Sequence, residues 1–280
     1  MLHESGLQAS DYRYLTLERR DHGVLLITIN RPEKLNATHE RLHWELSRIW
    51  LDVSDDPDTR VAVVTGAGNA FSAGGDLDMI ERQIKDIRII SGVLKEAADI
   101  VYNIVNCEKP VVSAINGVAV GAGLAVALMA DISIIAEDAR FTDGHIRLGV
   151  GAGDHAAIVW PLLCGLAKAK YYLLTAEFID GREAERIGLV SKCVPRDQLL
   201  PTAFEVAEKL ATGPQLAIRW TKRALNHWVR TAAPIFESSL AFEMLNFLDD
   251  DVEEGTRAIR EKREPRFPSL DLPASRPAPE

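Results

Sequence analysis

Two glycine-rich turns are the segments of this chain with the clearest chemical potential: Ala70–Asp76 (AFSAGGD) and Asn116–Gly123 (NGVAVGAG). Each follows an apolar, β-branched run and opens into a segment with helical spacing. A strand–turn–helix junction directs unpaired backbone N–H groups to one place, where a developing negative charge can be stabilised. Two such turns converging would form an oxyanion hole from main-chain groups alone, and their small residues would allow close approach. The pair therefore predicts an active site built on the backbone.

The elements around these turns alternate between strands and helices. Residues 11–30 read as two strands joined at Asp21-His22-Gly23, which is a hairpin signal. Thr38 is a plausible N-cap for a helix with the apolar stripe Leu42, Leu46, Ile49 and Val53. The pattern then predicts a strand from Val61, a helix over about Val93–Cys107, and strands at Pro110–Ile115 and Ile132–Ala136. This order of elements, two strands followed by a helix, differs from the βαβ order of a Rossmann fold.

From Pro201 onward the pattern is helical only. Helices are expected at 201–211, 214–230 and 233–249, with breaks at Gly213-Pro214 and Ala232-Ala233-Pro234. The two later helices carry more apolar residues than a small appendage can bury on itself, so we expect them to meet a partner. We divide the chain into a tail (1–10), a core with the active site (11–200), a helical region (201–267) and a disordered, Pro- and Ser-rich end (268–280).

Composition narrows the function classes. The 280 residues are 47% hydrophobic and 26% charged, which is ordinary for a globular protein. A net charge of −9 argues against nucleic acid as a partner, and an anionic ligand would need a local basic patch. No apolar run approaches a membrane span and no signal-peptide pattern is visible. Three widely spaced cysteines suit a reducing cytoplasm and give no zinc motif, so we expect no metal.

The ordered set of motifs resembles the crotonase (enoyl-CoA hydratase/isomerase) superfamily from about Tyr14 to Phe267. Besides the two turns, the resemblance rests on Ile29–Ala37 (INRPEKLNA), Ala130–Ile132, Ala139–Phe141, Leu173–Thr175, Ala184–Val190 and Glu261–Phe267. It implies an α/β fold with a spiral of ββα turns and a C-terminal helical region that drives trimer formation. A homotrimer or a dimer of trimers is therefore expected.

The resemblance also implies the ligand and its site. The expected substrate is an acyl-CoA thioester, with coenzyme A as part of the substrate and no separate cofactor. The oxyanion-hole amides would be those of Ala73 and Ala122. The remaining substrate-binding residues expected from the family motifs are Lys34, Leu35 and Ala37 along the adenosine end of CoA, and Gly74, Gly75, Asp76 and Gly121. Asp76 is at least as well suited to cap the helix that follows it.

This chain departs from its relatives at the catalytic acid and base. Family hydratases use two glutamates, and the matching positions here are Ala125 and His145. Water addition needs one group to hold or deprotonate water and another to protonate the α-carbon. Alanine can do neither, so an unmodified two-glutamate hydration mechanism is excluded.

A histidine and two carboxylates stand in for the missing glutamates. His145 is followed nine residues later by Asp154, and a histidine oriented by a carboxylate is a competent general base near neutral pH. The segment resembles the crotonase-type β-diketone hydrolases, which pair a His and an Asp at these places, and Glu243 falls where they carry a further acid. A purely structural His145 is the competing interpretation, and the adjacent His155 is a less favourable substitute.

Two other function classes compete with the crotonase enzyme. Gly151–Ala156 formally fits a dinucleotide-binding G-x-G-x-x-A pattern, but it sits late in the chain, and no Tyr-x-x-x-Lys accompanies it. A non-catalytic acyl-CoA binder is favoured a little by the missing glutamates. Isomerisation, hydration of an unusual enoyl thioester and C–C hydrolysis of a β-diketone all pass through a stabilised enolate, so the fold alone leaves them open.

Overall fold

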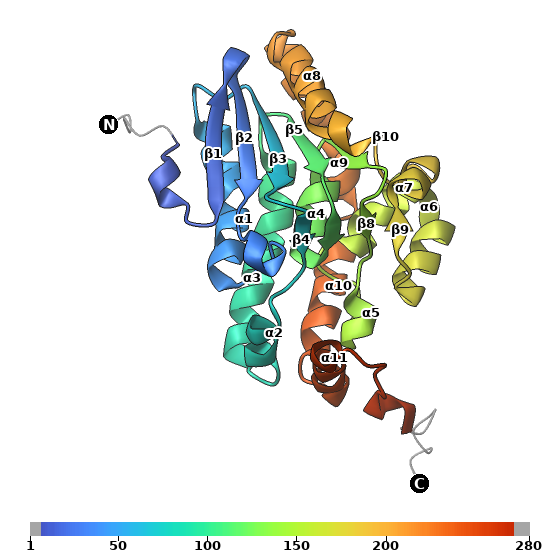
Figure 1. Ribbon diagram of the computed structural model, residues 1–280. Coiled ribbons are helices and arrows are strands. Elements are labelled where there is room, and N and C mark those ends of the chain that lie inside the picture. The colour runs from blue at the N-terminus through green and yellow to red at the C-terminus, as the bar shows by residue number, and fades with distance from the viewer. Residues whose placement is uncertain (1–6, 272–280) are drawn as a thin grey trace.

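The computed structural model of the chain describes residues 7–271 and places its strands in two sheets (Figure 1). The larger sheet has the order β1 (Leu15–Arg20), β2 (Val24–Ile29), β3 (Val61–Gly66), β5 (Val111–Ile115), β7 (Ile132–Ala136) and β10 (Lys192–Val194). The smaller sheet has the order β4 (Ala70–Ala73), β6 (Val118–Val120), β8 (Arg140–Phe141) and β9 (Ile179–Asp180). β1 and β2 form the expected antiparallel hairpin, joined at Asp21–Gly23.

The two sheets grow together as the chain advances. β3, β5 and β7 enter the larger sheet side by side and parallel, and each is followed at once by a strand of the smaller sheet, namely β4, β6 and β8. Helices follow each strand pair before the chain returns. This repetition is the expected spiral of ββα turns, and it brings the segments that follow β4, β6 and β8 to one cavity.

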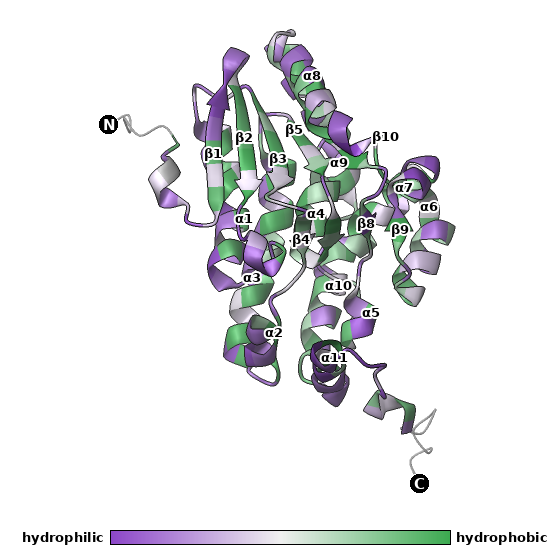
Figure 2. Ribbon diagram, in the orientation of Figure 1, coloured by the Kyte–Doolittle hydropathy of each residue, from purple (hydrophilic) through white to green (hydrophobic). Residues whose placement is uncertain are grey.

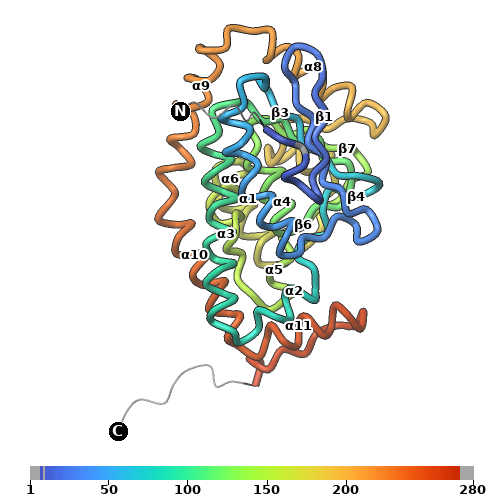
Figure 3. The backbone as a smooth tube through the Cα atoms, turned by 90° about the vertical axis from the view of Figure 1, so that its left-hand side faces the viewer, coloured from blue at the N-terminus to red at the C-terminus, as the bar shows by residue number. Residues whose placement is uncertain are grey.

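The helices cover the sheets and extend below them. Their bounds are α1 Glu40–Asp55, α2 Leu77–Gln83, α3 Ile87–Asn106, α4 Gly121–Met129, α5 His145–Leu148, α6 Ala156–Thr175, α7 Gly181–Arg186, α8 Leu199–Ala211, α9 Gln215–Thr231, α10 Ala233–Asn246 and α11 Asp250–Glu261. Short 3-10 turns lie at Ala9–Asp11, Asp21–Gly23, Pro32–Lys34, Arg196–Gln198 and Pro268–Asp271. Figure 3 shows α9 and α10 running along the outside of α3, with α11 closing the lower end.

The core lies between the larger sheet and the long helices. Every residue of β3 is buried, and Figure 2 shows β2, β3 and β5 as predominantly apolar while α11 is strongly polar. The expected stripe of α1 (Leu42, Leu46, Ile49, Val53) is fully buried. Burial of these large side chains contributes about 1.5–3 kcal/mol each, which fixes the sheet that carries the glycine turns.

Three expectations about the helices are corrected: two concern where a helix begins, and one concerns a helix that was not expected. The N-cap of α1 is His39, whose Nδ1 accepts from the Leu42 amide, because Thr38 is committed to a β-bridge with Gly75. α3 begins at Ile87 rather than near Val93, since Asp86 caps it. α11 was not expected at all, because its sequence has little apolar content; it buries Val252 and Ala258.

The end of the chain and α6 also differ from expectation. Pro268–Asp271 forms a 3-10 turn, so the disorder expected from 268 onward is wrong for those residues, while 272–280 and most of the expected tail 1–10 lie outside the described residues. By length and apolar composition alone, α6 reaches the threshold for a membrane span. Its backbone breaks at Gly165 (φ 77°, ψ 155°) and Trp160 is buried in the core, so α6 is not one continuous apolar rod.

Candidate active site

The backbone amides of the first glycine turn form hydrogen bonds that differ from the expected ones. The Ala73 N–H donates to the Leu35 carbonyl at 2.9 Å, so this amide is already satisfied within the chain. The assignment of Ala73 as an oxyanion donor is therefore corrected. The segment Ala70–Ala73 is itself the strand β4, and the turn proper begins at Gly74.

The amide of Gly75 is the available donor of this turn. Thr38 holds Gly75 from both sides, because its N–H donates to the Gly74 carbonyl at 2.7 Å and its carbonyl accepts from the Asp76 N–H at 2.9 Å. In a trans peptide the C=O and the following N–H point in opposite directions. The Gly75 N–H therefore points away from Thr38, and it has no hydrogen-bond partner within residues 7–271.

The second turn brings another free amide to the same place. α4 begins at Gly121, and its N-cap, Val120, makes no side-chain cap, so the first amides of the helix stay open. Gly121 has φ +52°, and a Cβ there would lie 3.4 Å from the Gly74 Cα and 3.7 Å from the Gly75 N. The two turns therefore touch, and Gly75 and Ala122 both line one cavity.

That cavity has a volume of about 480 Å³. One wall is apolar and includes Met79, Ile80, Val93, Ala97, Ile100, Met244 and Phe247. Met79 and Ile80 in this wall come from α2, whereas Trp160 of α6 lies in the core against Phe141, with ring centroids 6.1 Å apart.

A buried group of titratable side chains forms the polar end of the cavity. The His145 Nδ1 lies 2.9 Å from the Asp143 Oδ1, and its Nε2 lies 3.7 Å from the Asp154 Oδ2 and 3.5 Å from the Glu243 Oε1. The two longer separations exceed the length of a charge-assisted hydrogen bond, about 2.7–2.9 Å. The His145 Nε2 therefore faces both carboxylates and forms a short hydrogen bond with neither. His145, Asp154 and Glu243, expected from three separate segments, are brought together.

Backbone features place these side chains. His145 opens α5 directly after β8, with Gly144 at φ +80° as the N-cap. Asp154 precedes α6, and Glu243 comes from α10, which closes tightly over the Gly153 loop. A Cβ on Gly153 would lie 2.6 Å from the Glu243 Cβ, so only glycine admits this approach.

Sequence reasoning did not expect two members of the group, Asp143 and the contact made by His155. His155 is fully buried, and its Nδ1 is hydrogen-bonded to the Asp154 Oδ1, which leaves the Asp154 Oδ2 directed at His145. The buried Asp143 Oδ2, His155 Nε2 and Glu243 Oε2 have no hydrogen-bond partner in the described part of the chain. An acidic residue two positions before a histidine was the only available signal for Asp143.

The electrostatics of the group favour a charged histidine. Burial acts to lower the pKa of His145, but the Asp143, Asp154 and Glu243 carboxylates outweigh it and raise this pKa well above 6.5. Burial raises the pKa of Glu243 above its ordinary value. Burial also acts to raise the pKa of Asp154, yet the neighbouring His155 and His145 lower it overall. These pKa shifts favour an imidazolium at His145 beside an ionised Asp154, and a Glu243 that holds its proton more readily than an ordinary glutamate.

The same side chains have the donor set of a metal site. His145, Asp154 and Glu243 present one ligand atom each within 4.8 Å of one another, and so do Asp143, Asp154 and His155. A nitrogen with two carboxylate oxygens could ligate a divalent cation. The expectation that the protein uses no metal stays a prediction.

The remaining expected residues surround the mouth of the cavity. Lys34, Ala37, Asp76 and Gly121 line it, while Leu35 is 53% exposed and is not part of the lining. Asp76 caps α2 through the Asp78 amide at 2.9 Å, as expected, and Gly74 is buried in the turn. The expectation did not include His43, which lines the cavity with its Nδ1 2.8 Å from the Glu96 Oε2.

Comparison with known proteins identifies the family of this chain. The sequence profile of enoyl-CoA hydratase/isomerase matches residues 19–269. The chain belongs to the enoyl-CoA hydratase/isomerase family. It is 33% identical to a probable enoyl-CoA hydratase (echA8) of Mycobacterium bovis, covering 90% of this chain and 96% of that protein. It is accordingly an enzyme of the hydratase/isomerase family.

Two solved structures with the crotonase fold are similar to this chain and belong to enzymes with different reactions. An enoyl-CoA hydratase/isomerase from Mycobacterium paratuberculosis superposes with a TM-score of 0.84 at 35% identity, covering 88% of this chain and 99% of that one. A β-diketone hydrolase from Anabaena, solved with (S)-3-oxocyclohexyl acetic acid bound, superposes with a TM-score of 0.79 at 28% identity, covering 85% and 95%. Both branches expected from the sequence are therefore represented among proteins similar to this enzyme.

Proposed function

We propose that this enzyme acts on an acyl-CoA thioester whose carbonyl oxygen is bound by the amides of Gly75 and Ala122. The observation that supports it is the convergence of two free main-chain amides on a cavity that ends in a buried His–carboxylate group. As the α-carbon gains or loses its proton, charge develops on the thioester oxygen, where preorganised donors contribute about 2.7–4 kcal/mol each.

The acid–base roles follow from the charges of the buried group. Asp154, held by His155, is the base that accepts a proton from water or from a substrate carbon. His145, held by Asp143, is the cation that supplies a proton to the α-carbon of the enolate, with Glu243 as the second acid. In hydration, the water oxygen bonds to the β-carbon, its proton passes to Asp154, and proton transfer within the group restores the starting state. This differs from the two-glutamate mechanism because Ala125 offers no acid.

A substrate panel tests the proposal. Calorimetry with acetoacetyl-CoA and crotonyl-CoA should detect binding, and turnover should be found with at least one enoyl thioester, while crotonyl-CoA hydration is slow. Absence of measurable heat with every CoA thioester would contradict the thioester assignment. Binding without turnover would support a non-catalytic binder instead.

C–C hydrolysis of a β-diketone is the second candidate, favoured by a specific observation. His145 and Asp154 lie beside the apolar wall in the arrangement that the sequence resemblance associated with such hydrolases, and the Anabaena enzyme shares the fold. The same panel therefore includes cyclic β-diketones. Cleavage of a diketone with no heat from any thioester would make this the function.

The pH dependence of the rate should report His145 as an acid. We expect kcat/KM to be highest around neutral pH and to fall as pH rises through the raised pKa of His145, where the imidazolium is lost. If His145 acted instead as the general base, the slope would be opposite, with activity rising as pH increases through the same raised pKa, because only the neutral imidazole accepts a proton. Steady-state rates from pH 5 to 10 decide between the two.

We also propose a homotrimer or a dimer of trimers. Large apolar side chains remain exposed on α9, on α10 and just beyond the end of α10: Leu216, Trp220, Leu225, Trp228, Ile235, Phe242, Leu245 and Leu248. Trp228 is 71% exposed, and such a surface is typical of an interface rather than of a monomer. Light scattering at micromolar concentration should give three or six times the mass of one chain. A monomer would contradict the proposal.

The cytoplasmic location stays a prediction.

A further inference from the structure

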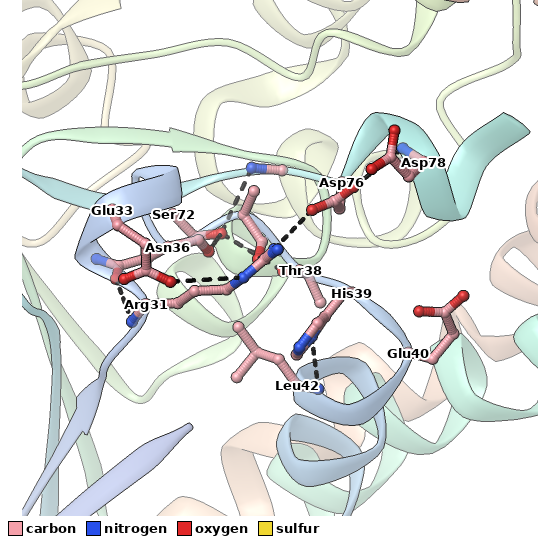
Figure 4. Close-up of polar contacts among 12 residues, drawn as sticks. Arg31, Glu33, Asn36, Thr38, His39, Glu40, Leu42, Ser72, Asp76 and Asp78 are labelled. Carbon is pink, nitrogen blue, oxygen red and sulfur yellow. Dashed lines mark hydrogen bonds and ion pairs between the residues drawn. The ribbon is translucent and has the colours of Figure 1, made fainter. Parts of the chain in front are cut away.

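The loop before α1 is tied to the first glycine turn by one arginine. The Arg31 Nη1 donates to the Asp76 Oδ2 at 2.7 Å and to the Ala37 carbonyl at 2.9 Å (Figure 4). Both side chains of the ion pair are only 12% exposed. Arg31 is not part of the cavity lining, so it does not reach a bound substrate directly.

Asp76 passes this contact on to two parts of the site. Its Oδ1 accepts from the Asp78 amide at 2.9 Å and so fixes the start of α2, whose Met79 and Ile80 line the cavity. Its own N–H donates to the Thr38 carbonyl, which is one of the two bonds that orient Gly75. Burial would raise the pKa of Asp76, but the Arg31 hydrogen bond and the Asp78 amide lower it, so the carboxylate stays charged.

The partner loop is held equally firmly. The Asn36 side chain is buried, accepts from the Arg31 amide at 2.9 Å, and donates to the Ala67 and Ala70 carbonyls. The Ser72 hydroxyl donates to the Asn36 carbonyl at 2.8 Å. With its backbone fixed in this way, the Arg31 guanidinium is presented to Asp76 from a rigid support.

We infer that Arg31 is a positioning residue for the oxyanion hole, acting through Asp76 and Thr38 on the direction of the Gly75 amide. This inference rests on the proposed function, in which that amide binds the thioester oxygen. A misplacement of about 1 Å at a reacting centre costs on the order of 10²-fold in rate. Loss of the ion pair should therefore lower kcat more than it changes KM.

The test compares Arg31→Met with Arg19→Met. Arg19 makes a similar pair with the buried Asp56 at 2.8 Å but lies outside the cavity, so it controls for the loss of an ion pair. For Arg31→Met we expect kcat to fall about 10- to 100-fold with KM changed less than about threefold. Arg19→Met should affect thermal stability only. A kcat for folded Arg31→Met within twofold of wild type would overturn the inference.

A second measurement needs no substrate. Hydrogen–deuterium exchange of residues 72–78 should be faster in Arg31→Met than in wild type and Arg19→Met. The Asp76 carboxylate loses the Arg31 donor that holds it, which loosens the bond from the Asp76 amide to the Thr38 carbonyl. Unchanged exchange there would also overturn the inference. If wild type turned over nothing in the panel, the proposed function would fail, while the exchange rates would still decide the role of Arg31. Should Arg31→Met not fold, Arg31→Lys replaces it, with the same measurements and a smaller expected loss of kcat.

Discussion

His145→Ala and Asp154→Asn are each expected to lower kcat by about 10²–10⁴-fold, because each removes one general acid or base from the proposed reaction. His145→Ala takes away the imidazole that faces Asp143, Asp154 and Glu243 together. Asp154→Asn keeps the shape of the side chain but removes its negative charge. Rates on the best substrate of the panel provide the measurement.

The control for these variants lies far from the cavity. His22 is exposed, with its Nε2 3.2 Å from Glu208, so His22→Ala should leave the rate unchanged. Since His145→Ala leaves three buried carboxylates without their shared cation, thermal unfolding should be recorded to separate misfolding from lost chemistry. Turnover close to wild type in both folded active-site variants would show that the pair is structural.

Ala122→Pro is expected to lower kcat by about 10²–10³-fold, because proline removes the backbone N–H proposed to bind the enolate oxygen. Ala122 is the second residue of α4, where proline is tolerated since the N–H has no partner inside the helix. The preceding residue is a glycine, which reduces the steric conflict with the proline ring.

Ala122→Gly and Ala122→Ser are the matched controls for this substitution. Both change the side chain and keep the amide, so both should retain activity within a few-fold of wild type. Circular dichroism and thermal unfolding should show that Ala122→Pro is folded. A folded Ala122→Pro enzyme with wild-type kcat would remove Ala122 from the oxyanion hole, whatever its substrate.

Much of the fold follows from local sequence. The apolar, β-branched runs at Val61–Gly66, Val111–Ile115 and Ile132–Ala136 specify buried parallel strands, because such side chains fit both faces of a covered sheet. The two glycine-rich turns could also be predicted from the sequence, because glycine is needed where two backbones come into contact. By contrast, α11 buries few large apolar residues, and its polar sequence gave no stripe to detect.

The chemistry of the site depended on contacts between distant segments. Which amide of the first turn is free was decided by Leu35 and Thr38, which bind the Ala73 amide and the groups on either side of Gly75. Local sequence carries no record of those bonds, so a motif could locate the turn but not the donor.

The state of His145 was decided in the same way. The sequence by itself led us to expect His145, Asp154 and Glu243 in place of the two missing glutamates. Only the tertiary structure added Asp143 and His155 and enclosed all five side chains together. Charges interact strongly only when they are close and shielded from water, and that enclosure is what raises the pKa of His145 and favours its cationic form.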